Sequence, residues 1–72
     1  EGNKLFKLPK SIGYLKKLEF FSIKYNYLKK LPTDIGNLTK LTFLDIRDNN
    51  FKDKEIAKIE EMLPSTNILS DR

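Results

Sequence analysis

Residues 28–50 read LKKLPTDIGNLTKLTFLDIRDNN, and residues 5–27, immediately before them, read LFKLPKSIGYLKKLEFFSIKYNY. Twelve of the 23 positions are identical between the two stretches, and most of the others keep their polarity. The period continues beyond them, because Phe51 lies 23 residues after Leu28. This agreement in register indicates an internal repeat, in which each unit is one small element of supersecondary structure.

Each repeat contains a segment with the alternation of a short β-strand. In the second repeat Leu44 and Ile46 are two residues apart, so both side chains point to one face of a strand. Asn26 and Asn49 each follow the strand by three residues, where a buried amide can bond the backbone and stacked copies can form a ladder. The apolar residues expected to face the core are Leu18, Phe21, Ile23, Leu41, Leu44 and Ile46.

A turn-forming segment precedes each expected strand. Residues 8–13 read LPKSIG and residues 31–36 read LPTDIG, so each segment carries Pro, then Ser or Asp, then Gly. These residue types favour a tight turn or a single turn of 3-10 helix. A unit of this size has apolar residues around its whole circuit, and it can bury them only by stacking on a neighbouring unit.

The combined pattern L-x-x-L-P-x-x-I-G-x-L-x-x-L-x-x-L-x-I-x-x-N resembles the leucine-rich repeat in its 23-residue form, over residues 3–51. The resemblance implies an α/β fold: a right-handed solenoid with a short parallel sheet on the concave face and 3-10 or short-helical turns on the convex face. It also implies a non-enzymatic role in binding proteins through the concave strands. We therefore expect residues 1–4 to be the remnant of an upstream repeat, followed by full repeats at 5–27 and 28–50.

The last part of the chain, residues 51–72, departs from the repeat and is expected to form a C-terminal cap. Asp53 is placed to cap a helix over about residues 54–63, which Pro64 ends. A short strand follows the helix. This ending resembles the cap of bacterial leucine-rich repeat proteins, which would imply a secreted or cell-surface location. The helix carries one apolar face, formed by Ile56, Ile59, Met62 and Leu63.

No comparable cap precedes the first repeat, so its strand would keep an unpaired edge. We expect the chain to be the C-terminal part of a longer array. Alternatively, the open edge pairs with a second copy in a structural or self-assembling unit, or the chain is an accessory recognition domain of a larger signalling or surface protein. The apolar residues expected to be partly exposed on this side are Leu5, Leu8, Ile12, Leu15, Leu18, Phe21 and Ile23.

Candidate binding residues lie on the outward-facing positions of the expected strands. Phe20 and Phe43 are equivalent in the two repeats, so they would lie about 4.8 Å apart as an exposed aromatic ladder. An aromatic centre with a charged rim is typical of protein-binding hot spots. The alternative, that the two rings only pack on each other or on a flanking element, stays open. The expected rim consists of Lys24, Tyr25, Asp45, Arg47 and Asp48.

The net charge of +4 is unevenly distributed along the chain. Residues 1–40 carry nine basic and three acidic side chains (+6), and residues 41–72 carry five basic and seven acidic ones (−2). Only Lys24 and Arg47 are expected beside the aromatic ladder, so binding of nucleic acid there is not favoured. The other lysines considered are expected on turns, edges and the convex side: Lys7, Lys10, Lys16, Lys17, Lys29, Lys30 and Lys40.

The residue types also exclude most kinds of catalytic and metal-binding site. The chain has no His and no Cys, so it lacks the commonest general base and all thiolate chemistry. Asp45, Asp48 and Asp53 lack the spacing of a calcium loop. We expect no catalytic residue, no metal, no cofactor and no insertion into a membrane.

Overall fold

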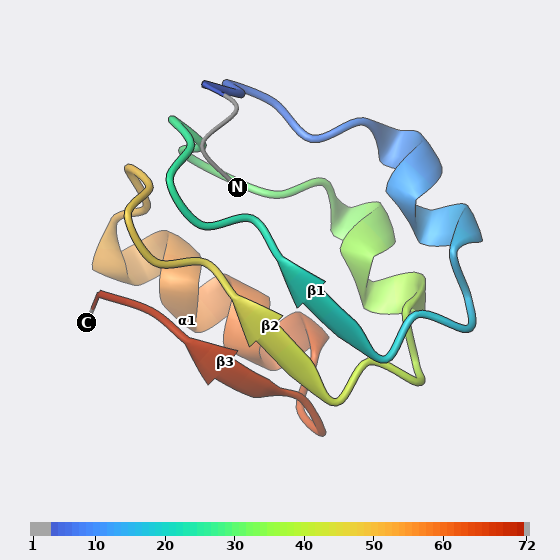
Figure 1. Ribbon diagram of the computed structural model, residues 1–72. Helices are drawn as coiled ribbons and strands as arrows, with labels where there is room; N and C mark the ends of the chain where they lie inside the picture. Colours follow the sequence, from blue (N-terminus) through green and yellow to red (C-terminus); the bar gives the residue numbers. More distant parts are fainter. Residues whose placement is uncertain (1–3, 72) are drawn as a thin grey trace.

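The computed structural model describes residues 4–71, in which the chain winds through successive coils (Figure 1). Each of the first two coils consists of a 3-10 helix and then a strand, and the last consists of an α-helix and then a strand. Residues 1–3 of the expected upstream remnant lie outside the described residues. The elements in chain order are η1 (Lys10–Tyr14), β1 (Phe20–Ser22), η2 (Thr33–Asn37), β2 (Phe43–Asp45), α1 (Asp53–Met62) and β3 (Asn67–Leu69).

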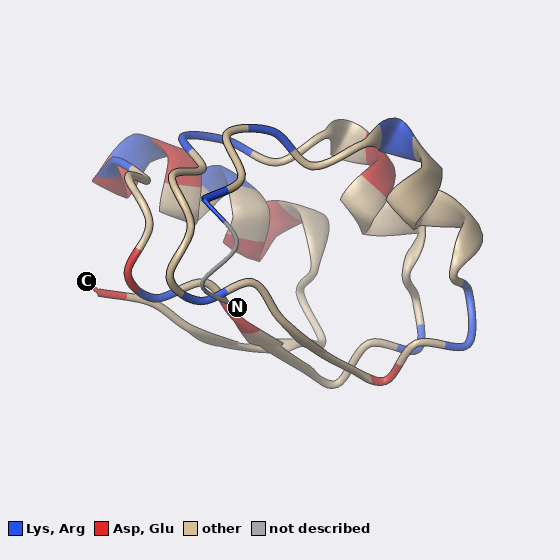
Figure 2. Ribbon diagram, turned by 45° about the horizontal axis from the view of Figure 1, so that its top comes forward, with Lys and Arg blue, Asp and Glu red and all other residues tan. Residues whose placement is uncertain are grey.

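The strands form one parallel sheet in the order β1-β2-β3. Phe20 pairs with Phe43, and Leu44 pairs with Ile68, so equivalent positions of the coils lie side by side. The helices form a second layer, in which η2 packs between η1 and α1 (Figures 1 and 2). The short parallel sheet and the 3-10 turns expected from the repeat are confirmed.

The hydrophobic core lies between the sheet and the layer of helices. Its most deeply buried side chains come from the second repeat and α1: Leu28, Ile35, Leu38, Leu44, Ile46 and Ile59. The second repeat is therefore the centre of the molecule, with the first repeat on one side and α1 on the other. The apolar face predicted for the helix is directed inward, where Ile56, Ile59 and Leu63 are buried and Met62 packs against the core.

The N-terminus of α1 differs in detail from the prediction. Asp53 is the first helical residue rather than the cap, and Lys52 occupies the N-cap position with an extended backbone. The Lys52 side chain makes no capping hydrogen bond within the described residues. Asp53 and Glu55 both lie in the first turn, where the positive end of the helix dipole favours carboxylates. Asp53 thus suits the helix start by its charge and position.

The outer side of the first repeat is less exposed than the sequence suggests. Ile12 and Ile23 are buried, because both point into the coil and belong to the same cluster as Leu28. Leu5 and Leu15 are 38% and 51% exposed and form the uncovered part of this side. The expectation was therefore wrong for the two isoleucines.

The repeated glycines at positions 13 and 36 meet different surroundings. A Cβ on Gly13 would lie 2.9 Å from the carbonyl oxygen of Asp34, because η1 stacks closely on η2. A Cβ on Gly36 would lie no closer than 3.6 Å to its nearest neighbour, the carbonyl oxygen of Met62. Steric crowding therefore requires glycine at position 13, between the two repeats. It does not require glycine at position 36, which faces α1.

We expect Gly13→Ala to lower the free energy of unfolding by about 1–3 kcal/mol, as overpacking does. Gly36→Ala is the matched control, and we expect no loss beyond about 0.5 kcal/mol because alanine restricts the unfolded chain more than glycine does. Urea unfolding followed by circular dichroism measures both. Equal losses in the two variants would contradict the steric argument.

Candidate functional site

The turn after each strand is held by an asparagine amide. The side-chain nitrogen of Asn49 donates to the carbonyl oxygens of Ile23 (2.8 Å), Ile46 (3.2 Å) and Arg47 (3.2 Å). Its side-chain oxygen accepts from the backbone N–H of Leu28 at 3.1 Å. One amide therefore connects the second repeat to the first and fixes the backbone at the end of β2.

Asn26 has the equivalent place one coil earlier. Its nitrogen donates to the carbonyl oxygens of Ile23 (2.9 Å) and Lys24 (3.2 Å), and its oxygen accepts from the N–H of Leu5 (3.0 Å). The carbonyl oxygen of Ile23 thus accepts from Asn26 and Asn49 together. This shared acceptor links the two copies in the ladder that the sequence suggested.

Both turns contain a residue in the left-handed region of backbone conformation. Tyr25 has a φ of 62° and Asp48 a φ of 57°, and they are equivalent positions of the two repeats. Such a conformation costs roughly 1–2 kcal/mol for a residue with a Cβ. The amides of Asn26 and Asn49 hold the neighbouring carbonyls and so stabilise these bends.

Phe20 and Phe43 lie on the face of the sheet turned away from α1, which we call the open face. Their rings stack with centroids 4.6 Å apart and an interplanar angle of 12°. The side chain of Phe20 is 66% exposed, whereas Phe43 is half-buried. The next residue on each strand, Phe21 or Leu44, points into the core. The open face therefore presents a fixed aromatic pair to solvent.

Arg47 and Asp45 form a two-pronged ion pair at the end of β2. Arg47 Nε donates to Asp45 Oδ1 at 3.0 Å, and a terminal guanidinium nitrogen donates to Oδ2 at 2.8 Å. The Arg47 hydrogen bonds hold the pKa of the Asp45 carboxyl below its usual range, although burial opposes this shift. The Arg47 side chain remains 42% exposed.

Asp45 was expected as an exposed member of the rim, and that expectation was wrong. Its residue exposure is 5%, because it lies on the central strand between Ser22 and Leu69 and beneath Arg47. Both of its oxygens are occupied by Arg47. Asp45 can position Arg47, but it does not offer a free carboxylate to a partner.

The remaining rim residues lie where the chain leaves β1 and β2. The ammonium of Lys24 lies 5.0 Å from the centroid of the Tyr25 ring, within the range of a cation–π contact. The N–H of Tyr25 donates to the carbonyl oxygen of Arg47 at 3.3 Å, which brings the two turns together. The N–H of Asp48 donates to the Asp71 carboxylate at 2.8 Å. The structure therefore places Tyr25 and Arg47 next to each other, where the chain leaves β1 and β2 after the aromatic pair.

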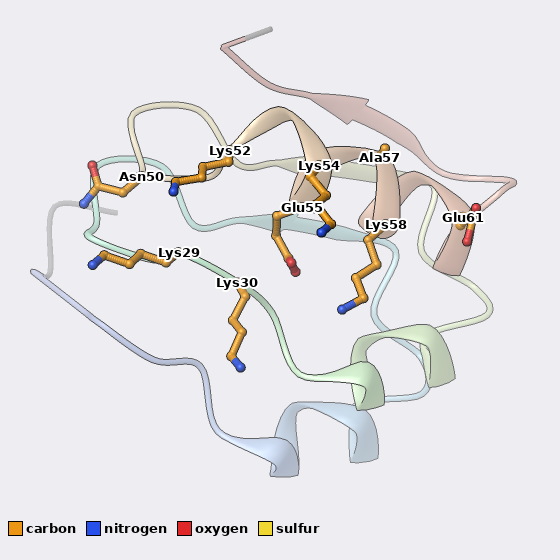
Figure 3. Close-up of a pocket in the computed structure, with 9 residues that line it drawn as sticks. All are labelled: Lys29, Lys30, Asn50, Lys52, Lys54, Glu55, Ala57, Lys58 and Glu61. Carbon is orange, nitrogen blue, oxygen red and sulfur yellow. The ribbon is translucent and has the colours of Figure 1, made fainter.

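A second group of charged residues was not recognised from the sequence. Lys29 and Lys30 face Lys52, Lys54 and Lys58 across a hollow of about 700 Å³ beside α1 (Figure 3). An adjoining hollow of about 580 Å³ is also lined by Lys7, Lys10, Lys30 and Lys58. The spacing of Lys54 and Lys58, which places both on one side of a helix, was the available signal. The sequence predicts that the loop lysines lie outside the concave face, but it does not predict that they converge with α1.

Comparisons with known proteins agree with the repeat. The family described as Leucine Rich Repeat matches residues 40–64, which run from before β2 through α1. A solved leucine-rich repeat protein of Leptospira interrogans superposes with a TM-score of 0.89 at 40% sequence identity, over 90% of this chain. The chain is a leucine-rich repeat protein. A search of curated proteins found no significant match.

This leucine-rich repeat protein spans 17% of the length of the Leptospira structure that it matches. The family is typically composed of non-enzymatic scaffolds that bind other proteins. Within residues 4–71, no helix is both long and apolar enough to cross a bilayer. In the same range, no three acidic side chains are grouped so that they could hold a metal ion.

The ion pair on β2 makes the stability of this leucine-rich repeat protein depend on pH. Because the pKa of Asp45 is lowered in the folded state, its contribution is complete above the unfolded pKa of about 3.9 and is lost as the pH falls through the folded pKa. Asp45→Asn should lower the free energy of unfolding by about 1 kcal/mol at pH 7, since Arg47 is partly screened by solvent. Urea unfolding between pH 2 and pH 7 should show this difference shrinking at the acid end (~pH 2–4). A difference that stays constant with pH would contradict the assignment.

Proposed function

We propose that this protein binds a protein partner through the open face, with Phe20 and Phe43 as anchors. The observation that supports this most is the stacked pair itself, in which Phe20 stays 66% exposed. Phe43 covers only one side of the Phe20 ring, so the stacked pair still presents apolar surface to a partner. Aromatic side chains held rigidly on strands lose little conformational freedom on binding, so they are effective anchors.

The residues beyond the aromatic pair would orient the partner. Asp45 holds the guanidinium of Arg47 by two hydrogen bonds, so Arg47 is ordered before any partner arrives. Tyr25 is exposed and carries Lys24 over its ring, and Asp48 adds an exposed carboxylate. A partner with an apolar patch flanked by acidic and basic groups would fit this surface. Charges at such a rim favour the correct orientation and fast association.

The experiment is capture of partners from a nuclease-treated extract, followed by titration of each purified partner. Phe20→Asp/Phe43→Asp should abolish capture and weaken titrated binding at least about a hundredfold, as expected for hot-spot residues. The matched control is Phe6→Asp/Tyr14→Asp, which changes two aromatics that are 73% and 83% exposed and lie outside the open face. Circular dichroism checks that both variants fold.

Partners that bind the Phe20→Asp/Phe43→Asp variant as tightly as the wild type would contradict a role for the open face. Loss of binding only in the control variant, Phe6→Asp/Tyr14→Asp, would also contradict a role for the open face.

A second candidate function is self-assembly through the outer side of the first repeat. Two observations favour it: β1 is an edge strand of the described sheet, and Leu5 and Leu15 of the same repeat are exposed. Sedimentation velocity over a concentration series tests this, with Leu15→Glu as the variant expected to remove any dimer. A monomer at every concentration would contradict self-pairing and leave this surface for a further repeat of a longer array.

The remaining assignments concern the ends of the solenoid. We propose that residues 51–72 are a C-terminal cap, because α1 covers the second repeat with Ile56 and Ile59. We also propose a right-handed winding, the sense that crossover connections between parallel strands nearly always take. Repeat arrays need such a terminal element to seal an otherwise open core.

A further inference from the structure

The two hollows beside α1 adjoin as parts of one grooved surface, because Lys30, Glu55 and Lys58 line both. We call it the lysine groove. One of its walls is α1, and the other is the chain that leads into η1 and η2 (Figure 3). We propose that the lysine groove binds an acidic, partly apolar segment of a partner protein in an extended conformation.

The charge of the lysine groove supports an anionic occupant. The first hollow has five lysines and two glutamates, and the second adds two lysines and no further acidic residue, so seven positive charges face two negative ones. Figure 2 shows basic residues on the loops beside α1, and both basic and acidic residues along α1 itself. The lysines are Lys7, Lys10, Lys29, Lys30, Lys52, Lys54 and Lys58.

The lysines of α1 are placed against the preferences of the helix. Lys52 is at the N-cap and Lys54 is in the first turn, where the positive end of the helix dipole disfavours cations. Lys54 and Lys58 are four residues apart, a spacing at which like charges repel. Lys58 also lies three residues from Glu55 and from Glu61, a spacing that favours the helix. Helix stability therefore does not explain Lys52 and Lys54, and an anionic ligand between Lys54 and Lys58 would relieve their repulsion.

The acidic residues in the lysine groove indicate which class of anion fits. Glu55 lies in the middle and extends between Lys30 and Lys58 (Figure 3), and Glu61 lies at the far end of α1. A nucleic acid carries a charge on every unit and would place one beside Glu55. A peptide can put acidic side chains on the lysines and a neutral residue or a backbone N–H beside Glu55.

The apolar part of the lining also suits a peptide. The second hollow includes Leu8, Leu31 and Met62, and none of the described residues that line either hollow is aromatic. Phe6 and Tyr27 stack on each other with centroids 5.2 Å apart and do not line the lysine groove. Base-stacking platforms are thus missing from its described walls, while aliphatic side chains of a peptide would find apolar contacts.

The length of α1 limits how many residues of the partner's extended segment can lie along the lysine groove. A helix of 10 residues is about 15 Å long. An extended chain covers that distance in roughly five residues. The lysine groove lies on the α1 side of the molecule, away from Phe20 and Phe43, so this proposal does not rest on the function of the open face.

The test is a fluorescence-anisotropy titration with a labelled peptide of about ten residues. In this probe Asp and Glu alternate with Leu and Val, and a control peptide carries Asn and Gln in place of Asp and Glu. Lys30→Gln/Lys58→Gln should weaken binding of the acidic peptide at least about tenfold, because it removes the two lysines that line both hollows. Lys16→Gln/Lys17→Gln removes the same charge on the turn after η1, and it should change the affinity less than about twofold.

Several results would overturn the proposal. The first is no binding of the acidic peptide to the wild type at low salt, and the second is equal binding of the neutral peptide. Equal weakening by the two double variants would reveal only general attraction to a basic protein. Tighter binding of single-stranded oligothymidylate, lost in Lys30→Gln/Lys58→Gln, would assign the lysine groove to nucleic acid. Phe20→Asp/Phe43→Asp should leave peptide binding unchanged, so this result separates the two surfaces.

Discussion

Asn49→Ala is expected to lower the free energy of unfolding by about 2–4 kcal/mol. The substitution removes three donated hydrogen bonds and one accepted one, and it leaves the carbonyl oxygen of Ile46 and the N–H of Leu28 without their side-chain partner. A polar group left unsatisfied costs about 1–3 kcal/mol when it is fully buried, and the groups bonded to Asn49 are partly buried. A domain of this size has a total stability of roughly 4–11 kcal/mol, so the loss is a large part of it.

Asn26→Ala is the natural comparison for this prediction. Asn26 makes two donated bonds and one accepted bond, and its donated bonds stay within its own coil. We expect a smaller loss, about 1–2 kcal/mol. Urea unfolding followed by circular dichroism measures both variants. A greater loss for Asn26→Ala would contradict the view that the bond from Asn49 to Ile23 holds the two repeats together.

Leu44→Ala is the second substitution with a large expected effect, a loss of about 3–4 kcal/mol. Leu44 is 0% exposed and lies on the central strand, where it pairs in register with Phe21 and Ile68. Neighbours on both sides hold the backbone in place, so the cavity cannot collapse. The surrounding side chains then lose their contacts with the removed atoms.

The control for Leu44→Ala is Phe20→Ala, on the neighbouring strand and the opposite face. Phe20 is exposed and loses only its stacking on Phe43, worth about 0.5–1.5 kcal/mol. For a domain of 60–100 residues, each 1 kcal/mol changes the melting temperature by about 4–8 °C, so thermal unfolding separates the two variants clearly. Similar melting temperatures would contradict the assignment of the core and open faces.

The repeat made most of the fold predictable from the sequence. The parallel sheet and the 3-10 turns follow from the repeat, because a fixed period leaves each unit one way to bury its apolar residues. The inward face of α1 follows from the helical spacing of its own apolar residues. Asp45 shows the limit of that argument. Alternation gives the face on which a side chain lies, but burial on that face depends on neighbours across the sheet. Arg47 two residues later points to the same side, and that spacing was the signal for the ion pair.

The lysine groove could not be predicted in the same way. Lys29 and Lys30 belong to the repeat, whereas Lys54 and Lys58 belong to the segment after it, and no periodicity relates the two. Their approach depends on how α1 packs beside η2, which is a property of the tertiary structure. The sequence gives the side of the helix that carries its lysines, but not what lies opposite.

The hydrogen bonds that join the two ends of each repeat have a consequence for how such a protein changes in length. The N–H of Tyr27 donates to the carbonyl oxygen of Leu5, and the same bond recurs 23 residues later from Asn50 to Leu28. Each bond joins the first and last residues of one repeat, so a duplicated copy of residues 28–50 would carry its own bond with it. Insertion of a single residue inside a repeat would instead shift one partner of that repeat's bond against the other. Recombination in whole units would lengthen the row of phenylalanines by one ring, about 4.8 Å, at each step. The size of the recognised epitope can thus evolve by duplication without redesign of the core.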